Sequence, residues 1–164
     1  MVHYSTGVAK EPESTLDRQL CFALYSASRA FTNLYRPFLD DLELTYPQYL
    51  VLLALWERES LTVKELGTAL RLDSGTLSPL LKRLEARGLL ARSRSVDDER
   101  SVRVELTGEG RELRQRGREI PQRMVAATGM ELGEIDELRS TLENLTAVLN
   151  DAARQITENR EMRT

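Results

Sequence analysis

The stretch of sequence that decides the fold is DSGTLSPLLKRLEARG, residues 73–88. Asp73 is a residue type that caps helix N-termini, and leucines then recur at three- and four-residue spacings, which predicts a helix with one buried face. Gly88 stands where such a helix ends, because glycine readily adopts the left-handed backbone conformation that follows a helix. The first turn, Ser74-Gly75-Thr76, is small and polar.

Two shorter helices and a β-hairpin surround this segment. The runs TYPQ (45–48) and TVKE (62–65) both have the capping-box spacing that begins a helix. Downstream, apolar residues predict a strand at Leu90–Ser95, and the alternation at Val102–Leu106 is that of a half-buried strand. The polar run Val96–Arg100 joins them as a turn. Three helices followed by a two-stranded hairpin is the order of a winged helix-turn-helix, so the predicted fold class is mainly α with a small β-hairpin wing.

A longer helix is predicted on the N-terminal side. Apolar residues recur at alternating spacings of four and three from Leu20 to Phe38, which is typical of an amphipathic helix. Ser14 or Thr15 is the expected cap, and Pro37 with the pair Asp40-Asp41 marks the expected end.

Two further helices are predicted on the C-terminal side. Thr107 begins one that runs to about Ala127, and Pro121 should kink or split it. Leu132–Ile156 carries a narrow apolar seam, typical of a helix that pairs with another long helix. We expect Glu158–Thr164 to be a fraying polar tail.

Length and composition limit the class of protein. The 164 residues carry a net charge of −3, one cysteine and one histidine. An internal disulfide, a multi-thiolate zinc site or a His-based catalytic centre is therefore not expected, and we expect no cofactor and no metal. No apolar run approaches the length of a membrane span, so the expected location is the cytoplasm, without a membrane partner.

Five segments are expected along the chain. They are a flexible tail at 1–14, a helix with the cysteine at 15–44, a winged helix-turn-helix domain at 45–107, C-terminal helices at 108–157, and a tail at 158–164.

Local charge points to DNA although the net charge does not. From Lys82 to Arg94 there are five basic residues and one acidic residue, Glu85, a local balance of 5 − 1 = +4. Such an excess beside a helix with a small polar first turn suits phosphate and major-groove contact. Arg100 at the hairpin tip could enter a minor groove, with Asp98 orienting it. The expected DNA-binding residues are Ser74, Gly75, Thr76, Ser78, Pro79, Lys82, Arg83, Arg92, Asp98 and Arg100.

The single cysteine shares a helix with two tyrosines. Cys21, Tyr25 and Tyr35 fall on one polar stripe of the predicted first helix. A phenol O–H that donates to a thiolate lowers the pKa of the thiol, which makes the sulfur more reactive. Tyr35 lies fourteen residues after Cys21, about 21 Å along a helix axis. Tyr35 therefore cannot touch the cysteine of its own helix, and could reach only that of a second subunit.

The motifs taken together resemble the MarR family of winged-helix transcription regulators. The resemblance covers roughly residues 15–156 and is carried by residues 73–85, Gly88-Leu89, Asp98-Glu99-Arg100 and residues 104–110. It implies a homodimer in which the first and last helices of both chains interlock. It also implies that two recognition helices meet a pseudo-palindromic operator in double-stranded DNA.

The cysteine and tyrosines are similar to those of the organic-hydroperoxide sensors within that family. The resemblance implies that Cys21 is the redox-sensing thiol, that Tyr35 and Tyr46 contact it across the dimer, and that Tyr25 lies nearby. The absence of a second cysteine matches the one-cysteine branch. The inducer would be an organic hydroperoxide, and the oxidised sulfur would be capped by a small-molecule thiol, attack a backbone nitrogen, or over-oxidise.

Three other hypotheses remain. The first is a MarR-type regulator released by a small aromatic ligand, with Cys21 inert. The second is a thiol peroxidase, but the chain lacks the pattern of a thioredoxin-like core, so an enzyme is not expected. The third, a dimerisation module without DNA, leaves the polar turn at 74–79 and the basic cluster unexplained.

Overall fold

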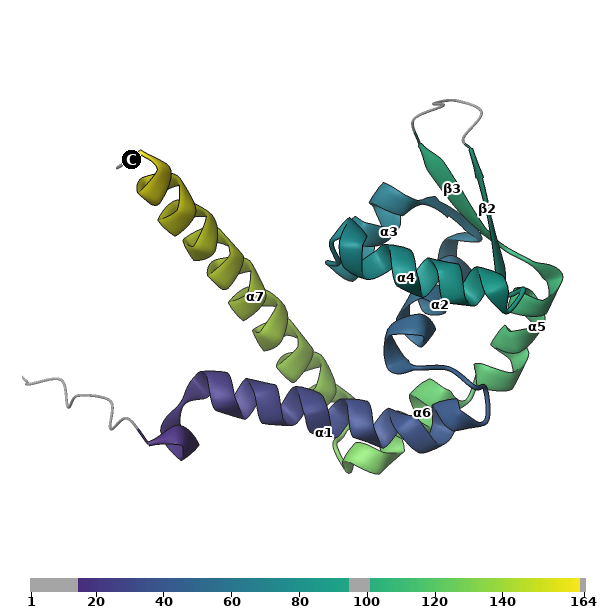
Figure 1. Ribbon diagram of the computed structural model, residues 1–164. Helices are drawn as coiled ribbons and strands as arrows, with labels where there is room; N and C mark the ends of the chain where they lie inside the picture. Colours follow the sequence, from purple (N-terminus) through teal and green to yellow (C-terminus); the bar gives the residue numbers. More distant parts are fainter. Residues whose placement is uncertain (1–14, 95–100, 163–164) are drawn as a thin grey trace, which may run out of the picture. The chain divides into compact units, whose positions relative to one another are not determined.

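The computed structural model describes residues 15–94 and 101–162, which form two compact units divided between Arg118 and Glu119 (Figure 1). The expected tail at 1–14 and the hairpin turn with Asp98 and Arg100 lie outside the described residues. The elements of the first unit are a 3-10 turn (Leu16–Arg18), α1 (Leu20–Asp40), α2 (Tyr46–Arg58), β1 (Ser60–Thr62), α3 (Val63–Leu70), α4 (Ser74–Ala86), β2 (Leu90–Arg94), β3 (Val102–Leu106) and α5 (Gly108–Gly117).

The first long helix differs from its prediction at its N-terminus, whereas its predicted end at the pair Asp40-Asp41 is confirmed. Thr15 is the N-cap of the 3-10 turn, whereas Gln19 is the N-cap of α1. Pro37 lies inside α1, which continues to Asp40. A proline so close to the end removes only one backbone hydrogen bond from the helix, so the last residues remain helical.

The caps of the predicted short helices are confirmed. The Thr62 and Glu65 side chains bond reciprocally, with the Thr62 N–H donating to Glu65 Oε2 at 2.7 Å and the Glu65 N–H donating to Thr62 Oγ1 at 3.1 Å. The Thr76 N–H donates to Asp73 Oδ1 at 2.9 Å. Gly88 has φ +70° and follows the end of α4, as the sequence predicts. The Thr62–Glu65 capping box thus fixes the start of α3, and Asp73 and Gly88 mark the two ends of α4.

The sheet has three strands rather than the two predicted. β3 lies in the middle, and β1 and β2 both pair with it antiparallel. β1 is three residues long, too short to show an alternating pattern in the sequence. Leu61 of β1 is buried and stands opposite Val104, also buried, so the short strand closes one edge of the core.

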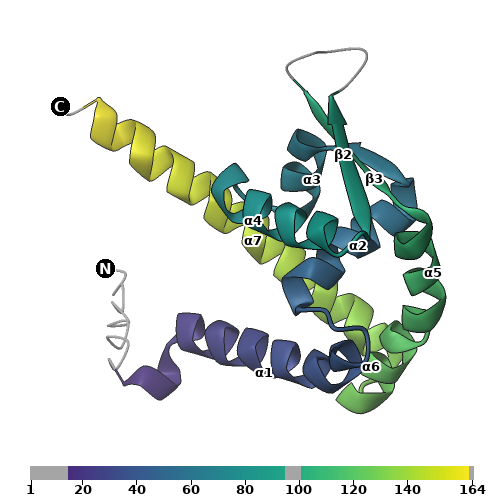
Figure 2. The same ribbon diagram turned by 45° about the vertical axis from the view of Figure 1, so that its right-hand side comes forward.

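The core of the first unit lies between the sheet and the helices α2, α3 and α4, which gather beside it (Figure 2). The most deeply buried apolar side chains include Leu52, Leu55, Leu66, Leu77, Leu81, Leu84, Leu90 and Val104. The Trp56 Nε1–H of α2 donates to the Gly110 carbonyl at 2.9 Å, which ties α5 to this core.

The second unit contains two helices, α6 (Ile120–Thr128) and α7 (Leu132–Glu161). The expected split at Pro121 is confirmed, since α5 ends at Gly117 and Pro121 occupies the first turn of α6. The expectation of a fraying tail from Glu158 is wrong, because α7 remains helical to Glu161. Every residue of α7 is at least partly exposed. None of the described helices combines the length and apolarity that a bilayer span requires.

Gly110 is a position where the fold requires glycine. A Cβ added there would overlap the carbonyl oxygen of Leu89 and lie 3.1 Å from Leu106 Cδ2. We therefore expect Gly110→Ala to lower the free energy of unfolding by about 3 kcal/mol, because the crowded backbone cannot move without disturbing the sheet. The measurement is urea unfolding followed by the fluorescence of Trp56, the single tryptophan.

Gly108→Ala is the matched control. A Cβ on Gly108 meets no described atom within 4 Å, and alanine is the better helix former at this first position of α5. The control should unfold at the same urea concentration as the wild type or slightly above it. Equal midpoints for the two alanine variants would contradict the assignment of Gly110.

Candidate nucleic-acid interface and candidate redox site

The first turn of α4 is open on the side expected to meet DNA. The side chains predicted to approach the groove, Ser74, Thr76, Ser78 and Pro79, are exposed, as is Gly75. Leu77 in the same turn is fully buried. The hydrophobic core therefore sets which face of the turn is exposed.

Two hydroxyl groups on this turn have their protons engaged within α4. Thr76 Oγ1 donates to Asp73 Oδ2 at 2.9 Å, and Ser78 Oγ donates to the Ser74 carbonyl at 2.7 Å. The backbone N–H of Thr76 holds the pKa of the Asp73 carboxyl below its usual range, so that carboxylate remains an acceptor. With their protons engaged, the two hydroxyls can still accept hydrogen bonds, as from the amino groups of cytosine or adenine.

Four of the five residues of the basic cluster divide into two groups. Lys82, Arg83 and Arg94 have exposed side chains. Arg92 instead donates from Nε to Glu85 Oε2 at 3.0 Å, and this contact lowers the pKa of the Glu85 carboxyl. Arg92 therefore ties β2 to α4, and its contact with DNA stays a prediction.

Sequence reasoning missed two basic residues near α4. A groove of about 840 Å³ is lined by residues of α3, α4 and both wing strands, including Lys64 and Arg71. Both side chains are at least partly exposed. The signal was faint, because Lys64 lies within the capping box of α3 and Arg71 follows that helix in a left-handed conformation with φ +55°.

Cys21 lies in the first turn of α1 and is exposed. Tyr25, one turn later, is also exposed, and its hydroxyl accepts a hydrogen bond from Arg29 Nη1 at 3.2 Å. The Arg29 guanidinium lies 5.5 Å from the centre of the Tyr25 ring. In the described residues no group of three His, Cys, Asp or Glu side chains is placed to hold a metal ion.

Tyr35 and Tyr46 meet in a cluster of aromatic rings between α1 and α2. Their ring centroids are 4.7 Å apart, and Tyr49 joins them at 5.8 Å from Tyr35. Burial raises the pKa of Tyr35 and of Tyr46, and the neighbouring Tyr46 contributes to the shift at Tyr35. A phenol with an ordinary pKa near 10 is already protonated at neutral pH, so both hydroxyls can donate hydrogen bonds there. Tyr49 was missed, although its spacing of three from Tyr46 places both on one face of a helix.

The structure brings Tyr35 and Tyr46 together and leaves Cys21 apart from them. Cys21 and Tyr35 belong to the same uninterrupted helix, Leu20–Asp40. Fourteen residues at a rise of 1.5 Å separate them by about 21 Å. The contact between Cys21 and the tyrosines of a second subunit stays a prediction.

Three helices packed on an antiparallel three-stranded sheet, with an exposed polar turn on the third helix, define a winged helix-turn-helix domain. Comparison with known proteins identifies the family. A profile described as transcriptional regulator SarA/Rot matches residues 33–116, and the chain belongs to this family of winged-helix, MarR-type transcriptional regulators. The family and the relatives are regulators of transcription rather than enzymes.

Individual relatives agree over most of the chain. The organic hydroperoxide resistance transcriptional regulator of Bacillus subtilis is 48% identical over 82% of this chain and 92% of its own length. The HTH-type transcriptional regulator TtmR of Methylorubrum extorquens is 52% identical over 86% of this chain and 70% of its own length.

Solved structures with the same fold include complexes with DNA and with a small molecule. Reduced AbfR bound to DNA has a TM-score of 0.72 and 38% identity, covering 82% of this chain and 92% of AbfR. NadR in complex with 4-hydroxyphenylacetate has a TM-score of 0.65 and 27% identity, covering 77% of this chain and 92% of NadR. The protein is a DNA-binding transcriptional regulator.

The Tyr49 hydroxyl gives a test of the aromatic cluster. Tyr49 is buried, no described group lies within hydrogen-bonding distance of its hydroxyl, and burial raises its pKa to about 12. We expect Tyr49→Phe to be about 1 kcal/mol more stable than the wild type at neutral pH, because a buried unpaired hydroxyl is unfavourable.

The difference should grow in alkali. Above its ordinary pKa of 10.0, Tyr49 ionises in the unfolded chain while the folded protein keeps the proton. Folded stability therefore falls as pH rises from about 10 towards 12 in the wild type, and phenylalanine removes this contribution. Urea unfolding at neutral and alkaline pH measures both effects, with Tyr25→Phe as the exposed control. A destabilised Tyr49→Phe variant would mean that the hydroxyl has a partner.

Proposed function

We propose that the protein is a homodimeric repressor that senses organic hydroperoxides through oxidation of Cys21 and then releases its operator. The observation that carries the proposal is the position of an exposed Cys21 on the same straight helix as Tyr35, which packs against Tyr46. A single chain holds the thiol and the phenols but cannot join them, whereas two chains can. The similarity to the Bacillus subtilis organic hydroperoxide resistance regulator supports the same function.

Apolar residues on α7 support a homodimer. Leu138, Leu142 and Leu149 recur along α7 and are between 39% and 54% exposed, and Ile156 is 68% exposed. A long helix with such a seam is stabilised when a second helix covers it. In the proposal, residues 15–44 and 108–157 of both chains form this interface. The two α4 helices then meet two half-sites of a pseudo-palindromic operator.

The proposed chemistry begins at the Cys21 sulfur. The thiolate attacks the terminal oxygen of the hydroperoxide, so an S–O bond forms, the O–O bond breaks, and the leaving alkoxide takes a proton to become an alcohol. Sulfur is oxidised by two electrons and the peroxide is reduced. The resulting sulfenic acid can condense with a small thiol, releasing water and forming a mixed disulfide. Phenol donors from the partner's Tyr35 and the partner's Tyr46 hold the thiolate before the reaction.

Release of DNA follows from the loss of those donors. A sulfur that carries oxygen or a bulky cap no longer accepts the same hydrogen bonds, and the interface around it repacks. Half-sites one helical turn apart tolerate little displacement of the recognition helices. Such a displacement would move the DNA-binding residues away from DNA. These are the polar first turn of α4 at 74–79, Lys82 and Arg83 at the phosphates, and Asp98 and Arg100 of the wing.

A second candidate function is release by a small aromatic ligand. The similarity to NadR, whose structure contains 4-hydroxyphenylacetate, favours this alternative. Cys21 would then be inert, and the ligand would displace the dimer from DNA without a covalent step. The two candidates differ in whether the thiol is needed.

Cys21→Ser separates the two candidates. We expect this variant to bind a duplex selected from a random-sequence pool as tightly as the wild type, because serine replaces one side-chain atom on an exposed position. Cumene hydroperoxide should release the wild type and leave the variant bound, in a mobility-shift assay. Mass spectrometry of the same samples should show added oxygen on Cys21 of the wild type. Equal release of both proteins would contradict the redox proposal, and release of both by an aromatic acid would support the alternative.

Lys82 and Arg83 test the orientation of the DNA-binding face. Each phosphate contact contributes roughly 0.9 to the slope of log affinity against log salt. Replacing both residues with glutamine removes four phosphate contacts from the proposed homodimer, two in each subunit, and should therefore reduce the magnitude of the slope by about 3.6. Arg58→Gln, an exposed change in α2 outside the proposed dimer interface, should leave the slope unchanged. A slope that Lys82→Gln/Arg83→Gln does not alter would exclude phosphate contact by these residues.

A further inference from the structure

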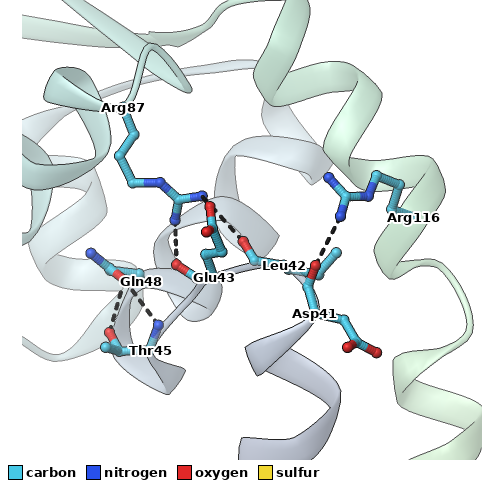
Figure 3. Close-up of polar contacts among 7 residues, drawn as sticks. All are labelled: Asp41, Leu42, Glu43, Thr45, Gln48, Arg87 and Arg116. Carbon is cyan, nitrogen blue, oxygen red and sulfur yellow. Dashed lines mark hydrogen bonds and ion pairs between the residues drawn. The ribbon is translucent and has the colours of Figure 1, made fainter.

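We propose that Arg87 is a positioning residue that couples the end of α1 to the recognition helix α4, with Arg116 holding the same loop from α5. The proposal rests on the proposed function, because it describes how a change in the cysteine-bearing helix reaches the DNA-binding face. It is carried by a set of hydrogen bonds around the α1–α2 loop (Figure 3).

The C-terminus of α1 is followed by a tight turn, residues 41–44. Glu43 has φ +53°, and the N–H groups of Glu43 and Leu44 donate back to the carbonyls of Asp40 and Leu39, both at 3.0 Å. Asp41 is the C-cap of α1, and the carbonyls that directly follow a helix lie at the negative end of its dipole. Cationic donors are therefore favoured at this place.

Two arginines from other elements supply those donors. Arg87 donates from Nη1 to the Glu43 carbonyl and from Nη2 to the Leu42 carbonyl at 3.2 Å. Arg116 donates from Nη2 to the Asp41 carbonyl at 2.8 Å. Three successive carbonyls are thus bound by two guanidinium groups, as Figure 3 shows. The Glu43 carboxylate adds an exposed ion pair to Arg87 at 3.4 Å, which contributes little in water.

Arg87 stands at a junction in the DNA-binding domain. It is the C-cap residue of α4, and Gly88 directly after it turns the chain towards β2. Its side chain binds the loop that follows α1, while its backbone terminates the recognition helix. A guanidinium that binds two carbonyls at once fixes direction as well as distance. A displacement of the α1–α2 loop therefore acts directly on the base of α4.

The loop has room to move on one side. A cavity of about 560 Å³ adjoins it and is lined by Arg87 and Arg116 together with carboxylates that include Asp41, Glu109 and Glu112. Leu39, Leu42 and Leu44 are buried and anchor the loop independently of the arginines. Removing Arg87 should consequently loosen the connection without unfolding the domain.

The experiment compares operator affinity before and after oxidation. For wild type and Arg87→Gln, the affinity for the selected duplex is measured on reduced protein and on protein treated with cumene hydroperoxide. The ratio compared is the affinity of the reduced protein divided by that of the oxidised protein. We expect this ratio to be smaller in the variant than in the wild type by a factor of about 2 to 30, the range found for substitutions along a coupling route. The rate of Cys21 oxidation, followed by mass spectrometry, should not change, which a general loss of structure would not permit.

Two control variants sharpen the result. Glu43→Gln keeps both carbonyl acceptors and should retain the wild-type affinity ratio to within about twofold, since it removes only an exposed ion pair. Arg58→Gln removes an exposed arginine from α2, outside the proposed dimer interface, and should also behave as the wild type. An unchanged ratio in Arg87→Gln, or an equal loss in Glu43→Gln, would overturn the proposal.

Hydrogen exchange distinguishes this proposal from the proposed function. In reduced protein, Arg87→Gln should speed amide exchange both at residues 41–44 and in the last turn of α4, while the centre of α2 stays protected. If hydroperoxide does not release the wild type from DNA, the proposed function fails. The coupling between the α1–α2 loop and α4 is then tested by hydrogen exchange alone. Faster exchange in the loop without a change in α4 would overturn it.

Discussion

The straightness of α1 is the constraint on which the proposed site depends. A continuous helix cannot bend back on itself, so about 21 Å always separates Cys21 from Tyr35 within one chain. Tyr35 packs against Tyr46 of α2, so both phenols are held away from the thiol of their own chain. A thiol tuned by these phenols must therefore belong to another chain. In the proposal, α1 therefore serves both peroxide sensing and dimerisation.

The basic residues near α4 show how context divides one residue type between two tasks. Arg87 and Arg92 point to acceptors within the protein, the carbonyls of the α1–α2 loop and the carboxylate of Glu85. Lys82 and Arg83 extend from the exposed face instead. The former pair holds the helix in place and the latter pair is available for phosphate. The local positive balance in the sequence therefore overstates the charge available to DNA.

Local features of the sequence predicted the helices, whereas contacts between residues far apart in the sequence could not be predicted from it. The caps at Thr62 and Asp73 depend on residues three positions away, so the spacing alone revealed them. β1 has three residues and gains its identity by pairing with Glu105 and its neighbours, over forty positions later. Arg87 was counted only as part of a charge cluster, because its acceptors lie 44 and 45 positions earlier in the chain.

The energy available at the proposed interface can be compared with what release of DNA requires. A hydrogen bond to a charged group contributes roughly 1.5–3 kcal/mol, and two phenols at each of two thiolates would give about 6–12 kcal/mol per dimer. Moving a two-state equilibrium from 1:99 to 99:1 requires about 5.5 kcal/mol. Release of DNA would then require only part of this energy to be transmitted through α1. The loop between α1 and α2 need not be rigid, but it must remain bonded to α4. A loop without these bonds would change its own conformation when α1 moves, and α4 would stay in place.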